Sequence, residues 1–469
     1  MTEFLTHPLP ALAQALYQRQ ISARDLVEEA IANHERCDAL TNAYLLWTSS
    51  RARKGAAAAD AAFAAGAIAG PLQGIPISIK DLFAAEGLPT FAGSDRRLPP
   101  EWEVDGPVVA ALRRQLGVIM GKTHMVEFAF GGTGQNCHWG APRNPWDKTA
   151  HRSPGGSSSG AGVSLMEGSA LLALGSDTAG SVRIPAAMTG TVGLKLTLGR
   201  WSAAGVVPLS PTFDTPGLLT RTVEDAAFGF GSIDAMVGDP FHYLSRISTL
   251  EIAGVRIGMG DPFLWSDCDP GIAEGAKAAV DALAAKGALV RERALPEARA
   301  AYDVFLEGGF SAIELRSFLD QELPQWLPEL DPIMAPAVKN AETLTAREYL
   351  ARLQRVRSLS RTAQERFADV EVFVSPTVCA TPALISEVRD TGGHLRVNRR
   401  LVHNTVGVNY LGLCAITLPV ALDRAGMPVG LQFIAPPGNE ERLIAVALAA
   451  EHALGTGRQR LGAPPLLAL

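Results

Sequence analysis

Two short segments of the sequence contain serines in settings that could support covalent catalysis. The segment SPGGSSSGAG covers residues 153–162 and has three consecutive serines. The segment GSDTAGSVRIPA covers residues 175–186 and contains Ser181. A lysine can activate a serine hydroxyl in place of a histidine, provided that it is neutral when it accepts the proton. Lys80 ends the apolar segment IPISIK and is a candidate for that base, because burial disfavours the ammonium form and lowers a lysine pKa.

The surroundings of Ser181 favour stabilisation of negative charge. An apolar strand is expected to end in a tight turn there and to be followed by a helix. Such a turn directs several backbone N–H groups into one small space, and the helix dipole adds positive potential for an oxyanion. Asp177 and Arg183 flank the turn, and two interpretations stay open: an ion pair that braces the turn, or an N-cap carboxylate beside a solvated arginine.

Each of these segments also has an interpretation without this chemistry. A Gly/Ser run is most often a flexible loop, and a single lysine at a strand end is most often a surface residue. Residues 156–160 read GSSSG and match the nucleophile elbow G-x-S-x-G, which would make Ser158 the nucleophile with a distant histidine such as His403. That elbow needs a strand directly before it, whereas the preceding NPWDKTAHRSP is rich in proline and turn formers.

Nucleotide and metal sites are not indicated. The segment GVIMGKT, residues 117–123, has three residues between its glycines where a phosphate-binding loop needs four, and its apolar centre favours a buried strand. The nine histidines are spread singly and never show metal-ligand spacing. We therefore expect neither a metal nor a cofactor.

The elements that must position these residues alternate between helices and short apolar strands, which predicts an α/β protein. Ser22 and Asp25 form a capping-box pattern at a helix start, the alanine-rich residues 53–65 favour a helix, and further helices are expected from Thr222 and over residues 346–367. The expected strands are residues 75–80, 118–122, 171–176, 255–260, 369–377 and 428–436. No linker divides the chain, so one large domain around a mixed sheet is predicted.

Three segments together resemble the amidase signature family. GIPISIKD, SPGGSSSG and GSDTAGSVRIPA look like the three blocks of that family in the same order, and the separation of the two serine segments also agrees. The similarity covers about residues 10–455 and is weakest between about 240 and 365. It implies an amidase signature fold, a large mixed sheet flanked by helices on both faces, in a single domain over residues 1–469. Its parts would be an N-terminal helical layer (about 8–66), a signature core (about 75–235) and the remaining sheet with its covering helices (about 250–455).

The resemblance implies a catalytic triad. Lys80 corresponds to the general base of the family, Ser157 to the bridging serine that follows a cis peptide bond, and Ser181 to the nucleophile. Ser181 would attack the carbonyl while Ser157 relays its proton to neutral Lys80, and the proton would return to the leaving amine as an acyl-enzyme forms. Water would then hydrolyse the acyl-enzyme.

Further groups follow from the same resemblance. The oxyanion would be bound by the backbone N–H groups of Thr178, Ala179, Gly180 and Ser181. Supporting groups would be Ser158, through a hydrogen bond to Lys80, together with Asp177, Arg183, Gly155 and Gly156. Ala179 stands where the family usually has glycine, and it would be strained if that position required a positive φ. Candidates for the substrate pocket are Phe128, Phe130, Gly132 and Thr133, although two alternating aromatic residues are also typical of a core strand.

Composition narrows the setting and the partners. The 469 residues are 47% hydrophobic and 19% charged with a net charge of −6, and no basic cluster suggests nucleic acid or anionic lipid. The five cysteines are scattered and never form a CxxC pair, which indicates a reducing compartment. No stretch has the pattern of a signal peptide or the length of a membrane span. We expect a cytoplasmic enzyme that acts on a small molecule, without nucleic acid or membrane partners, and allow for a homodimer.

The predicted function is hydrolysis of an amide-type C–N bond in a small molecule, releasing a carboxylate and ammonia or an amine. Primary amides, aryl amides, ureas, carbamates and esters stay open as substrates, because family membership defines the reaction and not the molecule. Two alternatives stay open as well. One is the glutaminase subunit of an aminoacyl-tRNA amidotransferase, against which the segment YDGxRYG has no match in this chain. The other is an α/β-hydrolase-type esterase that uses Ser158.

Overall fold

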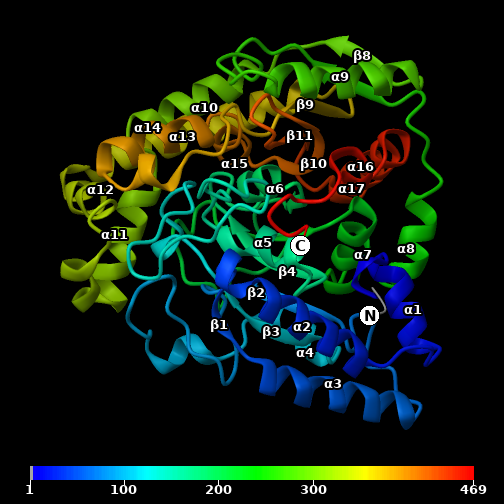
Figure 1. The fold of residues 1–469 in the computed structure, drawn as a ribbon. Helices are drawn as coiled ribbons and strands as arrows, with labels where there is room; N and C mark the ends of the chain where they lie inside the picture. Colours follow the sequence, from blue (N-terminus) through cyan, green and yellow to red (C-terminus); the bar gives the residue numbers. More distant parts are fainter. Residues whose placement is uncertain (1–3, 469) are drawn as a thin grey trace.

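A mixed sheet of 11 strands forms the centre of the computed structural model, which describes residues 4–468 (Figure 1). The order of strands across the sheet is β1-β3-β2-β4-β6-β5-β10-β11-β9-β7-β8. The strands are β1 Tyr44–Trp47, β2 Pro76–Lys80, β3 Val118–Thr123, β4 Leu172–Asp177, β5 Val192–Lys195, β6 Thr215–Thr220, β7 Arg256–Met259, β8 Leu289–Glu292, β9 Val372–Pro376, β10 Cys414–Leu422 and β11 Pro428–Ala435.

Helices flank this sheet, as the α/β expectation and the resemblance imply (Figure 1). The α-helices are α1 Leu9–Tyr17, α2 Ala23–Thr41, α3 Ser49–Ala64, α4 Pro107–Arg114, α5 Ser159–Glu167, α6 Arg183–Thr189, α7 Val223–Ile233, α8 Pro240–Ile247, α9 Ile272–Ala285, α10 Pro296–Leu306, α11 Ser311–Glu322, α12 Ala335–Asn340, α13 Ala346–Glu365, α14 Thr391–Leu401, α15 Val406–Tyr410, α16 Glu440–Leu454 and α17 Gly457–Leu461. The 3-10 turns are η1 Phe4–Thr6, η2 Pro100–Glu103, η3 Glu127–Ala129, η4 Pro324–Glu329, η5 Ala341–Thr343 and η6 Ile385–Val388. Within residues 4–468, no helix has both the length and the apolarity needed to cross a membrane.

The local signals that predicted helices are confirmed where they involve capping side chains. Ser22 and Asp25 form the predicted capping box at the start of α2, each accepting the backbone N–H of the other. Thr222 accepts the N–H of Asp225 at the start of α7. Both contacts satisfy N–H groups that the first helical turn leaves without an internal partner.

The six predicted strands are present, but β1, β5, β6, β8 and β10 were not predicted. Pro216 and Gly217 lie inside β6, and Pro419 lies inside β10, where the register with β11 is interrupted. Proline and glycine normally argue against the interior of a strand, which explains these omissions. β8 is an edge strand whose residues are mostly exposed, so it lacks the apolar pattern of a buried strand.

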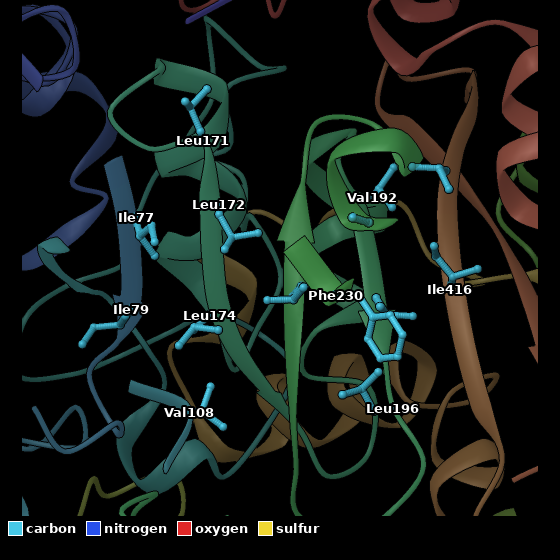
Figure 2. Packing of buried hydrophobic residues seen from close by; sticks show 14 of the residues in the cluster. Ile77, Ile79, Val108, Leu171, Leu172, Leu174, Val192, Leu196, Phe230 and Ile416 are labelled. Carbon is cyan, nitrogen blue, oxygen red and sulfur yellow. The ribbon is translucent and has the colours of Figure 1, made fainter. Parts of the chain in front are cut away.

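Both faces of β2 are buried, so the face that carries Ser78 and Lys80 also lies inside the protein. Ile77 and Ile79 pack in the main core beside β4 (Figure 2). On the other face, Ser78 contacts Ser164 of α5 through their hydroxyl groups, 2.9 Å apart, and Lys80 is fully buried. Apolar and polar side chains alternate along β2 as they would in a half-exposed strand, but here the polar side points into the interior and carries Lys80. Lys122 in β3 and Lys195 in β5 are also buried.

Two sets of parallel strands lie on either side of an antiparallel centre. β3, β2 and β4 are mutually parallel, and so are β9, β7 and β8. The four strands between them pair in antiparallel fashion. Ligand sites in α/β sheets form beyond the carboxyl ends of parallel strands, and Lys80 and Asp177 are the last residues of β2 and β4.

Candidate active site

Lys80 lies at the centre of a hydroxyl cluster. Its ammonium nitrogen is 2.7 Å from Ser157 Oγ and 2.9 Å from Ser176 Oγ. Burial lowers the pKa of Lys80 to about 7, although the charges of Asp214 and Asp177 raise it in part. Neutral and protonated lysine are therefore both populated near neutral pH, which is the condition for a general base.

The two serine segments meet directly beside this lysine. The peptide bond between Gly156 and Ser157 is cis, as the resemblance implies. A Cβ at Gly156 would lie 2.8 Å from the backbone nitrogen of Gly134, so only glycine fits at that position. The N–H of Ser158 donates to the carbonyl of Ser181 at 3.3 Å, which joins the segment of the bridging serine to the segment of the predicted nucleophile.

The turn that carries Ser181 follows β4 and leads into α6. β4 ends at Asp177, and α6 begins at Arg183. Gly180 has a φ of +128°, and a Cβ at this position would overlap the hydroxyl of Thr405. Glycine is thus required both by the backbone conformation and by the close approach of a neighbouring segment. Ser181 keeps 6% of its surface exposed, whereas Lys80 is fully buried.

Asp177 and Arg183 form the ion pair that was one of the two open interpretations. Both side chains are fully buried, and Arg183 Nη2 lies 3.0 Å from Asp177 Oδ1. The same carboxylate accepts the backbone N–H groups of Gly180 and Val182, and Arg183 also donates to Asn409. Burial alone would raise the pKa of Asp177, but the charge and hydrogen bonds of Arg183, together with Lys195 and Asn409, lower this pKa to about 2. Through these contacts the ion pair holds the turn in place.

This bracing alters the predicted set of oxyanion donors. The N–H of Gly180 donates to Asp177 Oδ1 at 2.8 Å and is therefore already engaged. Among the described residues, the N–H groups of Ala179 and Ser181 have no protein acceptor. Ala179 does not have a positive φ, so its methyl group is accommodated without the strain considered from the sequence.

The predicted hydrogen bond between Ser158 and Lys80 is wrong. The second hydroxyl on Lys80 belongs to Ser176, whereas Ser158 Oγ donates to the carbonyl of Ser176 at 3.5 Å. Ser176 is the next-to-last residue of β4, so its hydroxyl comes from a strand beside β2. The alternation of side chains along β4 was the sequence signal that could have found it.

The nucleophile-elbow interpretation of Ser158 does not match the structure. In the described chain, no strand lies between the end of β3 at Thr123 and Ser158. His403, its suggested partner, instead directs Nδ1 to Asn404 Oδ1 at 2.7 Å. A strand-turn-helix elbow is therefore absent at this point. In residues 4–468, no group of three or more His, Cys, Asp or Glu side chains is arranged to hold a metal ion.

The four pocket candidates separate into two pairs. Phe128 is 1% exposed and belongs to the main core, against which Phe130 also packs, so the core interpretation fits these two residues. Gly132 lies beside the serine turn, because a Cβ on Gly132 would lie 3.2 Å from Ile184 Cδ1 and one on Gly180 would lie 2.8 Å from the same atom. Gly132 and its neighbour Thr133 therefore remain candidates for the pocket.

Helix α14 contributes two residues to this area that sequence reasoning missed. Asn398 Oδ1 accepts the N–H of Gly132 at 2.7 Å, and His394 Nδ1 lies 3.1 Å from Thr133 Oγ1. Burial lowers the pKa of His394 to about 4, which keeps its ring neutral. They are four residues apart on one helical face, but no local signal connects them with a segment more than 250 positions earlier.

Comparison with known proteins agrees with this geometry. The sequence matches the profile of the Amidase family over residues 25–444. It is 47% identical over 454 residues to a 2-amino-5-chloromuconic acid deaminase of Comamonas testosteroni, with 97% of each chain covered. It is 32% identical over 484 residues to a glutamyl-tRNA(Gln) amidotransferase subunit of Anaeromyxobacter dehalogenans (strain 2CP-C), with 95% of each covered.

The solved structures lead to the same family. The fold superimposes on that of a 6-aminohexanoate cyclic dimer hydrolase complexed with substrate, with a TM-score of 0.85 and 27% identity. The match covers 99% of this chain and 100% of the other. Together with the profile match, these likenesses extend over nearly the whole length of the protein. The chain belongs to the amidase family and is a hydrolase that acts on carbon–nitrogen bonds in amides of small molecules.

Proposed function

We propose that the protein cleaves its substrate through an acyl-enzyme on Ser181, with Ser157 as proton relay and Lys80 as general base. The observation that carries this proposal is the 2.7 Å contact between Lys80 Nζ and Ser157 Oγ, made by a lysine whose pKa is lowered to about 7. A lysine in bulk water would be almost fully protonated at that pH and could not act as a base. Burial of Lys80 is thus the physical basis of the mechanism.

The proton path follows from these contacts. Ser181 Oγ forms a bond to the substrate carbonyl carbon while its proton passes to Ser157 and the proton of Ser157 passes to the Lys80 amine. The ammonium then returns a proton through Ser157 to the leaving nitrogen, the C–N bond breaks, and an acyl-enzyme remains. Water attacks the acyl-enzyme by the same path. Ser176 accepts a hydrogen bond from Nζ and so orients the amine lone pair toward Ser157.

The oxyanion is proposed to bind at the turn that precedes α6. The N–H groups of Ala179 and Ser181, with that of Thr178 beside them, supply the donors. The N–H of Gly180 does not, because Asp177 engages it. One such donor contributes roughly 3 to 4 kcal/mol to transition-state stabilisation. The Asp177–Arg183 pair holds the loop in place before substrate arrives, so the donors need no rearrangement during the reaction.

For the substrate, we propose the amide of a small, unsaturated carboxylic acid, because formation of the acyl-enzyme requires a nitrogen bound to a carbonyl carbon. The support is the 47% identity, over almost the full length of both chains, to the 2-amino-5-chloromuconic acid deaminase. The amidotransferase protein is less similar, at 32%, and this chain lacks the YDGxRYG segment. Release of ammonia from a small amide is therefore favoured over delivery of ammonia to an aminoacyl-tRNA.

Product release from a substrate panel tests the proposal. Purified wild type and Ser181→Ala would be incubated with 2-amino-5-chloromuconic acid, primary amides, anilides, aryl carbamates, ureas and glutamine, and products would be measured by mass spectrometry. We expect turnover by wild type and none by Ser181→Ala. Ser159→Ala is the matched control, because this neighbouring hydroxyl is buried and lacks a hydrogen-bond partner among the described residues. Equal rates for wild type and Ser181→Ala would refute the nucleophile assignment.

A further inference from the structure

A cavity is lined by residues that follow the carboxyl ends of β7 and β9, and β9 is labelled in the upper half of Figure 1. Its volume is about 860 Å³, and neither Lys80 nor the serines of the proposed triad line it. The residues that enclose it come from the loop after β7, from α10, from the segment after β9 and from the end of α14. Parallel strands in α/β sheets commonly form ligand sites at these ends.

One wall of this cavity is built from three rings that pack against one another at tilted angles. The ring centroids of Phe263 and His403 are 4.0 Å apart with an angle of 33° between their planes. Tyr302 completes the wall, 5.4 Å from Phe263 and 5.1 Å from His403. Burial lowers the pKa of His403, which favours the neutral form of its ring. Such a wall suits a planar ligand.

Two arginines supply positive charge at the same cavity. Arg299 Nε donates to Asp303, and its guanidinium lies 5.5 Å from the centre of the Phe263 ring. Arg400 uses only Nη2, which donates to Asp269 Oδ1 and to two backbone carbonyls. Among the described residues, the remaining guanidinium N–H groups of both arginines have no acceptor. A single carboxylate, Asp267, lines the cavity beside them.

The segment 403–405 separates this cavity from the serine turn and contacts both. His403 lines the cavity, and Asn404 donates to the carbonyl of Leu264 in the loop after β7 and to that of Pro376 at the end of β9. Thr405 faces the other way and donates to the carbonyl of Ala179 at 2.6 Å. The cavity is thus a separate space and not an extension of the proposed oxyanion site.

We propose that this cavity is a binding site for a small planar carboxylate. The carboxylate would accept hydrogen bonds from the free guanidinium edges of Arg299 and Arg400, and the flat body would lie against the rings of Phe263, Tyr302 and His403. Arginine is suited to this task because its planar fork of N–H groups matches the two oxygens of a carboxylate. The site does not depend on the proposed chemistry at Ser181.

Binding of benzoate to the full-length protein tests this site. Calorimetric titration of wild type with benzoate should show binding, and Arg299→Gln should weaken it by about tenfold or more, since a hydrogen bond to a charged group is lost. Benzyl alcohol lacks the charge and cyclohexanecarboxylate lacks the planar ring, so both should bind more weakly than benzoate. The arginine is 59% exposed, and its replacement should leave the fold intact.

Arg246→Gln is the matched control. Arg246 is 57% exposed, forms an ion pair with Glu441 and lies 5.6 Å from the centre of the Tyr243 ring, but it does not line the cavity. Benzoate should bind this variant as it binds wild type. Equal binding to Arg299→Gln and wild type would overturn the proposal and would place any bound benzoate elsewhere, including at the serine turn. Absence of binding to wild type would overturn it as well.

Discussion

The two sets of parallel strands carry charged side chains at their carboxyl ends, but in opposite environments. Beyond β2 and β4, Lys80, Asp177 and Arg183 are completely buried, and their charges are paired or suppressed. Beyond β7 and β9, Arg299 and Arg400 keep 59% and 41% of their side chains exposed and stay charged. Burial creates a base from a lysine in the first set, whereas exposure keeps arginines available for an anionic ligand in the second.

The two sets meet because the sheet twists. Five steps separate β4 from β9 in the sheet, and a rotation of about 20° per step accumulates to roughly 100°. The pairings between them would leave β4 and β9 pointing in opposite directions in a flat sheet. The segment 404–405 contacts both sets, because Asn404 donates to Pro376 at the end of β9 and Thr405 donates to Ala179 in the turn after β4.

The largest effect is expected when the buried base is removed. Lys80→Ala should lower kcat for an amide by roughly 10³ to 10⁴, which is the upper range for general acid–base catalysis. An activated ester of the same acid should lose less, because its leaving group does not need the returned proton. Rates for amide and ester substrates, with circular dichroism as the check on folding, decide the matter. Equal losses for the two substrates would contradict a role in protonating the leaving nitrogen.

The two regions should also differ in the value of an ion pair. Asp177→Ala leaves Arg183 buried without its partner and should lower the free energy of unfolding by about 3 to 5 kcal/mol. Asp303→Ala removes the exposed partner of Arg299 and should cost less than about 1 kcal/mol. Urea denaturation of both variants measures the contrast. Similar losses would mean that burial does not distinguish the two pairs.

A smaller effect is expected where the regions join. Thr405→Val keeps the shape of the side chain but removes the hydroxyl that donates to the Ala179 carbonyl. One lost hydrogen bond of about 1 kcal/mol corresponds to a change of roughly fivefold, and it should appear in kcat/KM because the oxyanion loop loses support. Thr212→Val serves as a comparison, since its hydroxyl contacts only Tyr349, at 3.4 Å. An unchanged kcat/KM for Thr405→Val would show that the loop is held without this contact.

The finest test concerns the pH profile of the first region. Below pH about 7 the Lys80 amine becomes protonated, so kcat/KM should fall on the acid side. The negative charge of Asp214 raises the pKa of Lys80, and Asp214→Asn should therefore move this acid limb to lower pH. The rate profile from pH 5 to 9 measures the shift. A limb that moves to higher pH would show that the assigned coupling has the wrong sign.

The sequence predicted the catalytic residues of the first region better than the residues that hold them in place. Lys80, Ser157 and Ser181 lie in continuous motifs, so their types and spacing could be interpreted directly. Ser176 could have been found from the alternation along β4, but the contacts of Thr405 and Asn398 join segments far apart in the chain. Part of the second region, including Arg299, lies where the resemblance is weakest, and neither Arg299 nor Arg400 belongs to a motif. Long-range contacts of this kind exist only after folding.

The glycines show the same division. The loop glycines of the motif were predicted to permit a sharp path, and Gly156 indeed has no room for a side chain. The requirement at Gly180 is different, because the hydroxyl of Thr405 fills the space that a Cβ would need. Nothing near Gly180 in the sequence indicates this neighbour. At both positions the neighbour comes from another segment, so the sequence could predict a need for glycine but not the residue that causes it.

The buried lysines also determine how the stability of the protein responds to alkali. Burial lowers the pKa of Lys80 to about 7 and those of Lys122 and Lys195 to about 8, whereas the unfolded chain keeps lysine at about 10.4. Between pH 8 and 9 the unfolded state therefore binds more protons at these three sites, and proton linkage makes unfolding less favourable as pH rises. Other groups oppose this trend: the pKa of His138 is raised to about 10, burial raises that of Glu451 to about 8, and burial also raises those of the cysteines. A base stored as a neutral amine thus favours the folded state as pH rises, whereas the buried acids and thiols whose pKa values are raised act in the opposite direction.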